Sequence, residues 1–435
     1  MMKDRSMRSS VDAALAHMRQ AGATRSQCIF CCERRVALTA EQGEIGTLAT
    51  RLEQKLHLQA HLGERCGVET ATSLDKNSLR EAAESAIERA RRSSPDPARA
   101  IACTGAVRRF ASGNAAADPA AMLDFLQGFQ AQIAGEFPSA ACTRADLTFV
   151  ASTLAVRNTA GTDLESRTGE YRVNGVFTRA GSPGGTSFAR AQFRRSALDR
   201  PLLDCGGMRE LLRRTMDRTP PSPPPAEPDM ELVVAPQAVD YLLSHIRHHL
   251  SDAAVLARAS LFAERLGRPV ADPVFTLHSL PRHPAMQSKV FITPDGFEAL
   301  DATIIREGVL ASLLLSQAGA RRTGYARAPN PGGRWVVAPG TRSSRDLVAD
   351  VACGVLLGRL SGTKPDASGD FSGVAKNSFL IRDGRIRHPL EATTVSGNLA
   401  ELLRGITAVS SDRIDFGDRI LPWIRVGREA LEIGR

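Results

Sequence analysis

A proline-rich stretch near the middle of the chain sets the strongest limit on how it can fold. Residues 218–229, RTPPSPPPAEPD, hold six prolines in twelve positions. Proline lacks a backbone N–H and fixes φ, which excludes a helix interior or a central strand. A chain of 435 residues also exceeds the size of one ordinary core. The sequence therefore predicts an N-terminal α+β domain over 1–217, an extended linker over 218–230 and a C-terminal α+β domain over 231–435.

The N-terminal half alternates between strand-like and helix-like patterns. Apolar and polar residues alternate over 55–72 around a turn at Gly63, and a strand, a turn at Asn158–Gly161 and a second strand follow over 147–180. Both segments predict antiparallel hairpins. A further strand is predicted over 27–38, and helices are predicted over 11–21, 75–97 and 119–136.

The C-terminal half begins with a short strand, a helix initiated by proline and a second helix ending at Gly267. Later, residues 368–409 predict a strand over 371–381, a tight turn at Asp383–Gly384, a strand over 385–396 and a helix from Asn398. Antiparallel hairpins with segregated helices indicate an α+β fold rather than a doubly wound parallel sheet. Neither GxGxxG nor GxxxxGK[ST] occurs.

Charge and hydropathy restrict the classes of function. The net charge is +9, but much of the excess is arginine in scattered pairs, and only 5% of residues are aromatic. A nucleic-acid binder usually interleaves a basic cluster with aromatic residues, so this composition argues against one. No run of eighteen apolar residues occurs, and the N-terminus has no secretory signal pattern. We therefore expect a cytoplasmic protein that does not span a membrane.

Cysteine and serine motifs give weak signals for chemistry. Cys28-x-x-Cys31-Cys32 invites a zinc interpretation, but no second CxxC pair follows, and the apolar segment favours a strand in which cysteine packs as a small hydrophobic residue. In GDFSG, residues 369–373, Ser372 has no histidine at a motif-defined position to activate it. We expect Gly369 and Gly373 to permit a bulge or a close backbone approach instead, and Asp370 or Ser372 to cap a turn.

Three of the nine histidines lie in DYLLSHIRHHL, residues 240–250. His245 and His249 are four residues apart, which places both on one face of a helix at a spacing that metallopeptidases use for zinc. A zinc site needs about three protein ligands, and the sequence does not fix the third. We favour a solvated or subunit-facing helix surface over an adapted metal site for His245, His248 and His249. The acidic candidates for a third ligand are Glu298, Asp301 and Glu307.

Several segments together resemble the TldD/PmbA family, which is described as metalloproteases and as modulators of DNA gyrase. The most specific is SGDFSGVAKNSFLIRDGRIRHPLEATTVSGNLAELL, residues 368–403. RRSSPDP, VVAPQAVDYLL, TGYARAPN and LPWIRVG agree with the family in the same order. The resemblance covers about residues 10 to 430 and is looser over the first 120. It implies a TldD/PmbA-like fold.

The resemblance also implies which kind of subunit this is. TldD-type subunits bind zinc through an HExxxH helix, which follows two apolar residues, and a late cysteine, whereas PmbA-type (TldE-type) subunits lack these ligands and pair with a TldD-type subunit. Aligned with that helix, LLSHIRHH puts Ser244 at the first histidine, His245 at the glutamate and His249 at the second histidine. Phe416 lies about where the late cysteine belongs, and no cysteine follows Cys353. The resemblance therefore implies no catalytic, cofactor-binding or metal-binding residue in this chain, with zinc in the partner.

These observations predict a non-catalytic PmbA/TldE-like subunit of a zinc-dependent peptidase complex. Its partners would be a TldD-type HExxxH subunit and a peptide substrate, with self-association into a homodimer as a further expectation. The substrates implied are unfolded peptides or the leader segments of ribosomally made peptides. Two alternatives stay open at this point: a metallohydrolase with a rearranged site at His245 and His249, and a regulatory protein that acts on gyrase or other nucleic-acid machinery.

Overall fold

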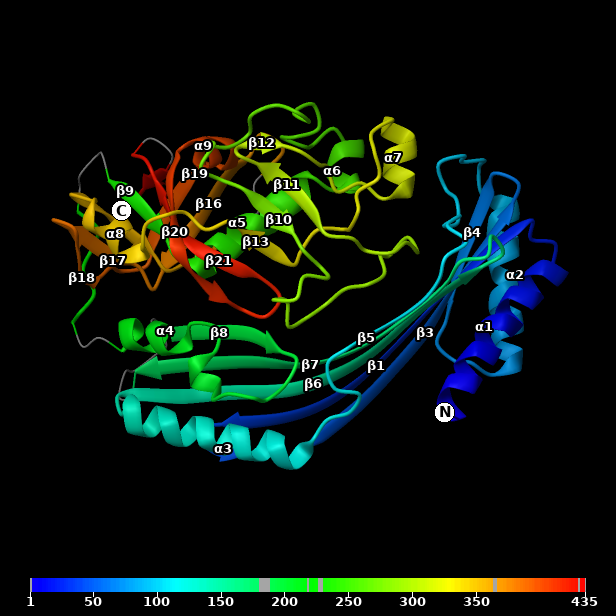
Figure 1. The fold of residues 1–435 in the computed structure, drawn as a ribbon, viewed down its shortest axis with the longest axis horizontal. Helices are drawn as coiled ribbons and strands as arrows, with labels where there is room; N and C mark the ends of the chain where they lie inside the picture. Colours follow the sequence, from blue (N-terminus) through cyan, green and yellow to red (C-terminus); the bar gives the residue numbers. More distant parts are fainter. Residues whose placement is uncertain are drawn as a thin grey trace.

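Three β-sheets and a small set of helices make up the fold seen in a computed structural model (Figure 1). A long curved sheet from the N-terminal half runs along one side, and the C-terminal half lies over one of its faces. The structure describes residues 2–179, 188–216, 219–225, 230–362, 366–428 and 431–434.

The first sheet is eight-stranded and mostly antiparallel. Its strands are β1 Arg25–Glu41, β2 Glu44–Ile45, β3 Ala49–Leu62, β4 Arg65–Ala71, β5 Val107–Ser112, β6 Ala140–Asn158, β7 Asp163–Arg179 and β8 Phe188–Arg195. The order is β4-β3-β1-β6-β7-β5, with β2 added to β1 and β8 added to β7. The first half of β7 pairs in parallel with β5, and its second half pairs with β8 in antiparallel orientation. β8 is therefore at the edge of this sheet, beside the C-terminal half.

Helices cover the two ends of the eight-stranded sheet separately. At one end, α1 (Met2–Gln20) and α2 (Lys76–Arg92) pack on β1 and β3 around a core that includes Leu56 and Ile87. Asp75 caps α2, and Gly67 of β4 permits its close approach, because a Cβ there would lie 2.0 Å from a backbone oxygen of α2. At the other end, α3 (Pro119–Glu136) packs on β1 and β6 (Figure 1).

The C-terminal half contains a ten-stranded and a four-stranded sheet. The ten strands are β9 Glu231–Val234, β10 Leu277–Ser279, β11 Ala302–Arg306, β12 Val309–Leu310, β13 Trp335–Val337, β14 Cys353–Leu357, β17 Phe379–Arg382, β18 Arg385–Pro389, β20 Ile406–Asp415 and β21 Ile420–Val426. The smaller sheet is β15 Arg359–Gly362, β16 Asp370–Lys376, β19 Thr393–Asn398 and β22 Leu431–Ile433. β9 pairs in parallel with β14 at the centre of the larger sheet, whose two faces are both buried.

Helix α5 (Pro236–His249) is the main helix of the C-terminal half, and it contacts both β21 and β15. Its apolar side chains, among them Leu243 and Ile246, join the largest core of the molecule. Pro236 begins the helix at a position where the missing N–H costs nothing. The remaining helices are short: η1 Leu202–Asp204, α4 Met208–Thr215, α6 Asp252–Leu256, α7 Gln317–Thr323, α8 Ser344–Ala349 and α9 Leu399–Arg404.

The α+β fold class is confirmed, and most of the predicted elements are present. The hairpins turn at Gly63 and at Asn158–Gly161, as their patterns predicted. The turn at Asp383–Gly384 and the helix beginning after Asn398, which caps α9, are also confirmed. The helix predicted over 11–21 begins earlier, at Met2.

Three predicted elements in the C-terminal half are wrong in extent. The second helix ends at Leu256, well before Gly267, because Arg258 has a positive φ and the following residues turn back toward the core. The strand predicted over 371–381 is two strands, β16 and β17, separated at Asn377, whose φ is also positive. The strand over 385–396 likewise splits into β18 and β19, and each member of the predicted hairpin thus crosses between two sheets.

The proline-rich segment separates the sheets in sequence but not the cores. All strands of the eight-stranded sheet precede residue 218, and all strands of the other two follow residue 230. The largest core nevertheless draws buried side chains from both halves, including Phe177 and Leu232. Ser222 forms backbone hydrogen bonds with Pro389 and Glu391, so this part of the crossing lies against the C-terminal half. The division into two domains stays a prediction. No helix in the described part of the chain is both long and apolar enough to cross a membrane.

Candidate functional site: a cleft between the two halves

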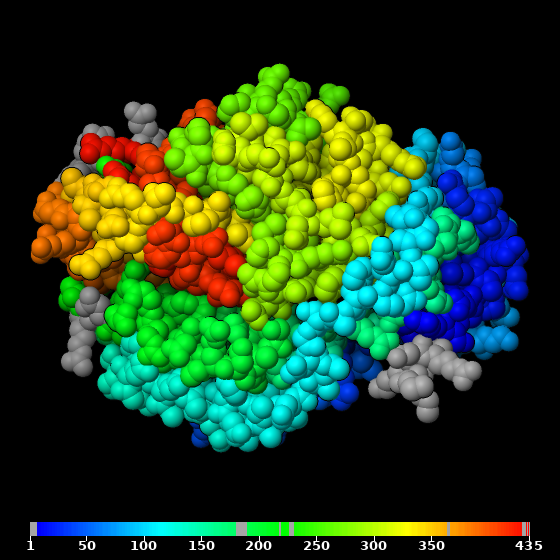
Figure 2. All heavy atoms as spheres, in the orientation of Figure 1, coloured from blue at the N-terminus to red at the C-terminus, as the bar shows by residue number. Residues whose placement is uncertain are grey.

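Two adjoining cavities lie where the eight-stranded sheet faces the C-terminal half. One, of about 560 Å³, is lined largely by β1, β6, β7 and β8; the other, of about 490 Å³, is lined by β8, α5 and β15. Both include Gln192, Asp240 and Arg419 in their walls, so they form one cleft. Figure 2 shows the two halves in contact along this boundary, with green residues of β8 and α4 beside red residues near the C-terminus.

A turn between β20 and β21 docks directly on β8 and holds the cleft together. The backbone N–H of Arg194 donates to the carbonyl of Phe416 at 2.8 Å, and its guanidinium Nε lies 2.7 Å from a carboxylate oxygen of Asp418. Gly417 has a φ of 85°, and a Cβ there would lie 1.9 Å from the carbonyl oxygen of Arg194. Only glycine allows the turn to approach β8 this closely.

Arg419 organises the wall that the two cavities share. Its guanidinium lies 4.5 Å above the ring of Phe416 and its Nε is 2.7 Å from Oδ1 of Asp240, while Nη1 forms an ion pair with Asp418. Burial raises the pKa of Asp240, although the positive charge of Arg419 opposes the shift. A charged network from α5 and the 416–419 turn therefore occupies the middle of the cleft.

The structure brings together two positions that the family resemblance singled out. Ser244, at the place of the first histidine of HExxxH, and Phe416, near the place of the late cysteine, line the same 490 Å³ cavity. The Ser244 hydroxyl donates to the carbonyl of Tyr241 at 2.6 Å, and the Phe416 ring is buried. At these two positions this chain has a short hydroxyl and a phenyl ring. In TldD-type subunits the resemblance places an imidazole and a thiolate there.

The expectation of a solvated histidine face is wrong for two of the three histidines. His245 is 4% exposed and His249 is 1% exposed, whereas His248 is exposed to solvent. The physical reason is that α5 is covered by both β21 and β15, so its buried stripe is wider than the leucine and isoleucine positions alone indicate. The interpretation as a subunit-facing surface fails for the same reason.

His249 is a core residue with apolar neighbours. Its ring makes an edge contact with Phe262 at 6.1 Å, and Nδ1 accepts the N–H of Leu261 at 3.4 Å. Among the residues that the structure describes, its Nε2 has no hydrogen-bond partner. Burial, and then the neighbouring His248, lower the pKa of His249. His245 packs its ring edge-to-face with Tyr241 at 4.4 Å. Both rings fill space in the core.

The donor groups that the structure describes do not gather into a zinc site of the kind considered for His245 and His249. Across residues 7–179, 188–216, 219–225, 230–362 and 366–428, no three His, Cys, Asp or Glu side chains gather as a metal site. The candidate third ligands are engaged elsewhere: Glu298 pairs with Arg282 at 3.0 Å, and Asp301 accepts the Arg282 backbone N–H at 2.9 Å. The third candidate, Glu307, is exposed at a turn with a positive φ.

The cysteine and serine motifs have structural settings. Cys28 is fully buried on β1, and burial raises the pKa of its thiol. Asp370 accepts from the side chain of Asn398 at 2.8 Å, and Gly369, at a φ of 92°, donates its N–H to the carbonyl of Asp366 and closes the turn before β16. Ser372 lies on β16, which pairs with β15 and β19. These residues shape the four-stranded sheet that supports one wall of the cleft.

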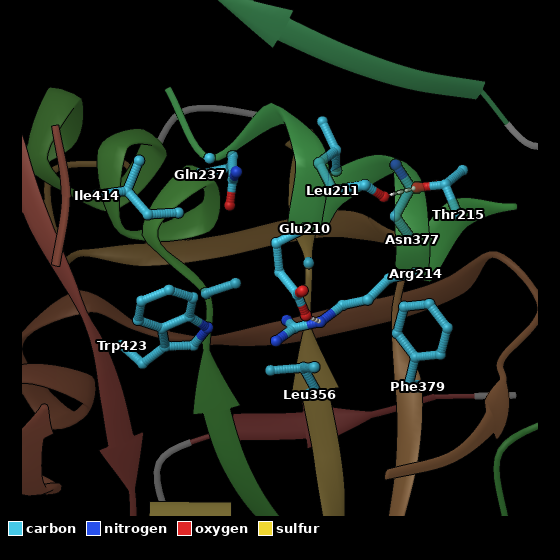
Figure 3. Close-up of a pocket in the computed structure, with 13 residues that line it drawn as sticks. Glu210, Leu211, Arg214, Thr215, Gln237, Leu356, Asn377, Phe379, Ile414 and Trp423 are labelled. Carbon is cyan, nitrogen blue, oxygen red and sulfur yellow. Dashed lines mark hydrogen bonds and ion pairs between the residues drawn. The ribbon is translucent and has the colours of Figure 1, made fainter. Parts of the chain in front are cut away.

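A second, much smaller pocket lies under helix α4 (Figure 3). Its volume is about 30 Å³, which is room for roughly one or two water molecules. Arg214 and Glu210 of α4 form an ion pair at 2.7 Å over Trp423, Leu356 and Phe379 of the ten-stranded sheet. This contact attaches the end of the N-terminal half to the C-terminal half. The pocket itself is too small for a peptide.

Sequence reasoning missed the charged residues of the cleft. Asp240 lies four residues before Ser244, so both occupy one face of α5, and this spacing was a usable signal. No pattern in the sequence connects Arg190 of β8 with Arg359 of β15, because the two strands meet only through the packing of separate sheets.

The fold defined above is shared with TldE-like proteins of known structure. The crystal structure of TldE from Thermococcus kodakarensis matches 98% of this chain and 100% of its own, with a TM-score of 0.85 and 19% identity. Residues 227–433 match the model of the PmbA/TldA metallopeptidase C-terminal domain.

Two curated relatives extend this likeness at the sequence level. The metalloprotease PmbA of Escherichia coli O157:H7 is 24% identical over 206 residues, 45% of each chain. A metalloprotease of Methanothermobacter thermautotrophicus is 28% identical over 228 residues, 48% of this chain and 50% of the relative. This chain thus aligns with about half the length of these curated relatives. Residues 227–433 of the chain therefore match a domain of the TldD/PmbA family.

Proposed function

We propose that this chain is a TldE-type companion subunit of a TldD/PmbA peptidase and that it does not hydrolyse peptides alone. The observation that supports the proposal is the cavity at Ser244 and Phe416. The two positions converge on one cavity, as positions of a former zinc site would, yet neither side chain is a zinc ligand. The catalytic zinc would belong to a TldD-type partner with an HExxxH helix.

The role of this chain in the complex would be to hold an extended peptide. Residues of β8 and β15 line the cleft. In the described structure β8 forms a strand pair only with β7, and its N–H at Arg194 bonds to Phe416, while β15 pairs only with β16. A strand with an unpaired edge can add an extended peptide through backbone hydrogen bonds, which read shape before side-chain identity. Unfolded peptides or leader segments of ribosomally made peptides fit this mode of binding.

Co-expression with an HExxxH-bearing relative tests the proposal. We expect one co-eluting species that survives dilution to sub-micromolar concentration, because a stable pair buries an interface on the order of 2,000 Å² or more. This species should cleave an unstructured peptide, whereas each subunit alone should not. Self-association of this chain is measured in the same experiment.

The zinc content of the separated subunits gives the control. We expect about one zinc per TldD-type subunit and well below one per copy of this chain. The proposal fails if this chain binds no such relative and the relative cleaves peptides unaided. Stoichiometric zinc in this chain alone would instead favour a metallohydrolase with its own site.

A further inference from the structure

Strand β3 has an open edge along its first half. β1 pairs with β3 from Ala49 to His61, but β4 pairs with the other side of β3 only from Leu56 onward. In the described structure, residues 49–55 therefore have a strand partner on one side only. Six of these seven residues are exposed, and the side chain of Leu52 at their centre is 57% exposed.

The backbone groups on the open side belong to the even-numbered residues of β3. The carbonyl of His61 accepts the N–H of Thr24, just before β1, at 2.8 Å, so the odd-numbered residues point their N–H and C=O groups toward β1. These directions alternate along a strand, and β3 keeps one register with β1 throughout. Thr50, Leu52 and Gln54 therefore direct an N–H and a C=O to the open side. Among the residues that the structure describes, none of these groups has a hydrogen-bond partner.

Like charges face each other across β1 and β3 beside this edge. Glu33 lies opposite Glu53, and Arg35 lies opposite Arg51. Like charges directly opposite each other destabilise a strand pair. Ion pairs form along each strand, Arg35 with Glu33 and Arg51 with Glu53, but no opposite charge lies across from either acidic or basic pair within the two strands. A further strand with an arginine beside Glu53 and a glutamate beside Arg51 would supply those charges.

We propose that residues 49–55 of β3 pair in antiparallel orientation with the same residues of a second copy of this chain, about a two-fold axis at Leu52. Leu52 is the midpoint of the open edge, so this register uses all seven residues of both copies. Leu52 then exchanges two backbone hydrogen bonds with Leu52 of the second copy, and Thr50 does the same with Gln54. The pairing goes beyond the companion role, because it needs no TldD-type subunit.

The charges of the two copies complement each other in this register. Arg51 lies opposite Glu53 of the second copy, and Glu53 lies opposite Arg51 of the second copy. Each like-charge pair between β1 and β3 thereby has an opposite charge as its next neighbour. Any extended segment offers the same backbone groups, but the order Arg-Leu-Glu at residues 51–53 complements itself when it is read in the reverse direction. This self-complementarity favours a second copy over an unrelated strand.

Sedimentation equilibrium of the full chain measures the pairing. One strand pair is smaller than a standard interface, so we expect a dissociation constant on the order of 10 µM. Arg51→Glu and Glu53→Arg should each weaken the dimer by at least about tenfold, because each change turns both charge pairs between the copies into like-charge pairs. Neither change should disturb the fold, since each replaces a like-charge pair with β1 by a pair of opposite charges.

Mixing the two charge variants in equal amounts supplies the decisive comparison. In a mixed pair one copy has two glutamates at positions 51 and 53 and the other copy has two arginines, so both charge pairs between the copies are again of opposite sign. We expect the mixture to dimerise with about the affinity of the unchanged chain, while each variant alone stays monomeric at the same concentration. A contact through another surface would not show this recovery.

A proline substitution tests the backbone part of the pairing. Leu52→Pro removes the central N–H on the open side and should abolish the dimer. Val68→Pro is the matched control on β4, where Val68 is also exposed and its N–H also points away from the neighbouring strand, as that of Cys66 does toward Ser93. The control should dimerise like the unchanged chain, and circular dichroism shows whether both variants fold.

Three results would overturn the proposal. They are a monomeric unchanged chain at about thirty times the expected dissociation constant, undiminished dimers of either charge variant, and a mixture that stays monomeric. Binding of a TldD-type subunit that Leu52→Pro abolishes, without any dimer of this chain alone, would assign the edge to that subunit and overturn the second copy as its occupant. Failure of the pairing leaves the companion role intact, because partner-dependent cleavage is measured separately.

Discussion

Helix α5 presents two pairs of polar residues with the same spacing and opposite surroundings. Asp240 and Ser244 are four residues apart and line the cleft, whereas His245 and His249 are four residues apart and are buried in the core. The histidine pair has the spacing of a zinc site, but it is the other pair that adjoins the cavity. Spacing thus identifies a face of a helix, and only packing decides what that face meets.

The difference separates residues held for stability from residues available for binding. Around His249 the neighbours are Phe262 and Leu261, and the imidazole fills space. Around Asp240 the neighbours are Arg419 and Asp418, and the groups form a polar network open to the cleft. Substitutions of the buried histidines should therefore change mainly stability, and substitutions of Asp240 or Ser244 should change mainly peptide binding.

The largest effect is expected from removing both buried histidines. His245→Ala together with His249→Ala should destabilise the fold by about 2–5 kcal/mol, because two buried rings leave cavities that the surrounding core fills only in part. Urea denaturation measures this change in the free energy of unfolding. His248→Ala, on the exposed side of the same helix, is the matched control and should change stability by less than about 0.5 kcal/mol. Equal effects from the two would mean that the face is solvated after all.

The local elements were predictable where one segment contains its own signal. The hairpin at Gly63 and helix α2 follow from alternation and helical periodicity within a few residues. The division of 371–381 between two sheets was not predictable, because alternation continues across Asn377 and only the tertiary arrangement sends β17 to the larger sheet. Propensity and pattern are weak guides where tertiary packing overrides them.

The candidate site was predictable only in part, for the same reason. The positions of Ser244 and Phe416 came from a family resemblance, and the structure places both on one cavity. The sequence could not show that Arg190 and Arg359 line the same cavity, because β8 and β15 belong to separate sheets that meet only through packing. The burial of His249 required knowing that β21 and β15 cover both flanks of α5.

The second-largest effect is expected in how the free energy of unfolding depends on pH, because a buried histidine with a lowered pKa lies in each half of the molecule. Burial, followed by the charges of Arg25 and Arg99, lowers the pKa of His61 to about 4, and burial also lowers the pKa of His249. In the unfolded chain both titrate near 6.5. Below that pH the unfolded state binds more protons, so stability falls as the pH drops below about 6.5, by up to about 1.4 kcal/mol per pH unit for each histidine, and for His61 the fall continues toward pH 4.

Substitution isolates the contribution of each histidine from that of the carboxylates. His61→Gln and His249→Gln should each reduce the slope of unfolding free energy against pH between about 6.5 and 4, while His248→Gln should not. Denaturant titrations at several pH values measure these slopes. Unchanged slopes in both buried variants would show that neither imidazole is kept neutral by the fold, and the contrast between the two faces of α5 would lose its electrostatic basis.

A smaller change in stability is expected on the cleft face. Asp240→Asn removes one partner of Arg419, which keeps Asp418, so the cost should be about 1 kcal/mol or less. The same substitution removes a negative charge from the cavity wall and should tighten binding of an unstructured peptide of net negative charge several-fold. Asp12→Asn, at an exposed ion pair with Arg157, makes the same charge change far from the cleft and should not affect peptide binding. Weaker binding by the Asp240 variant would show that this carboxylate does not repel the peptide.

The smallest change in stability is expected from Ser244→Trp, which nevertheless should have the clearest effect on binding. Ser244 is exposed at the cavity, so the larger side chain displaces solvent rather than core atoms, and the free energy of unfolding should change by less than about 0.5 kcal/mol. The indole would occupy part of the 490 Å³ cavity, and peptide affinity should fall by at least about tenfold. His248→Trp adds the same side chain to an exposed position of α5 that lines neither cavity of the cleft, and it should leave peptide affinity unchanged. Equal loss in both variants would assign the effect to the helix as a whole, and no loss in either would place the peptide outside this cavity.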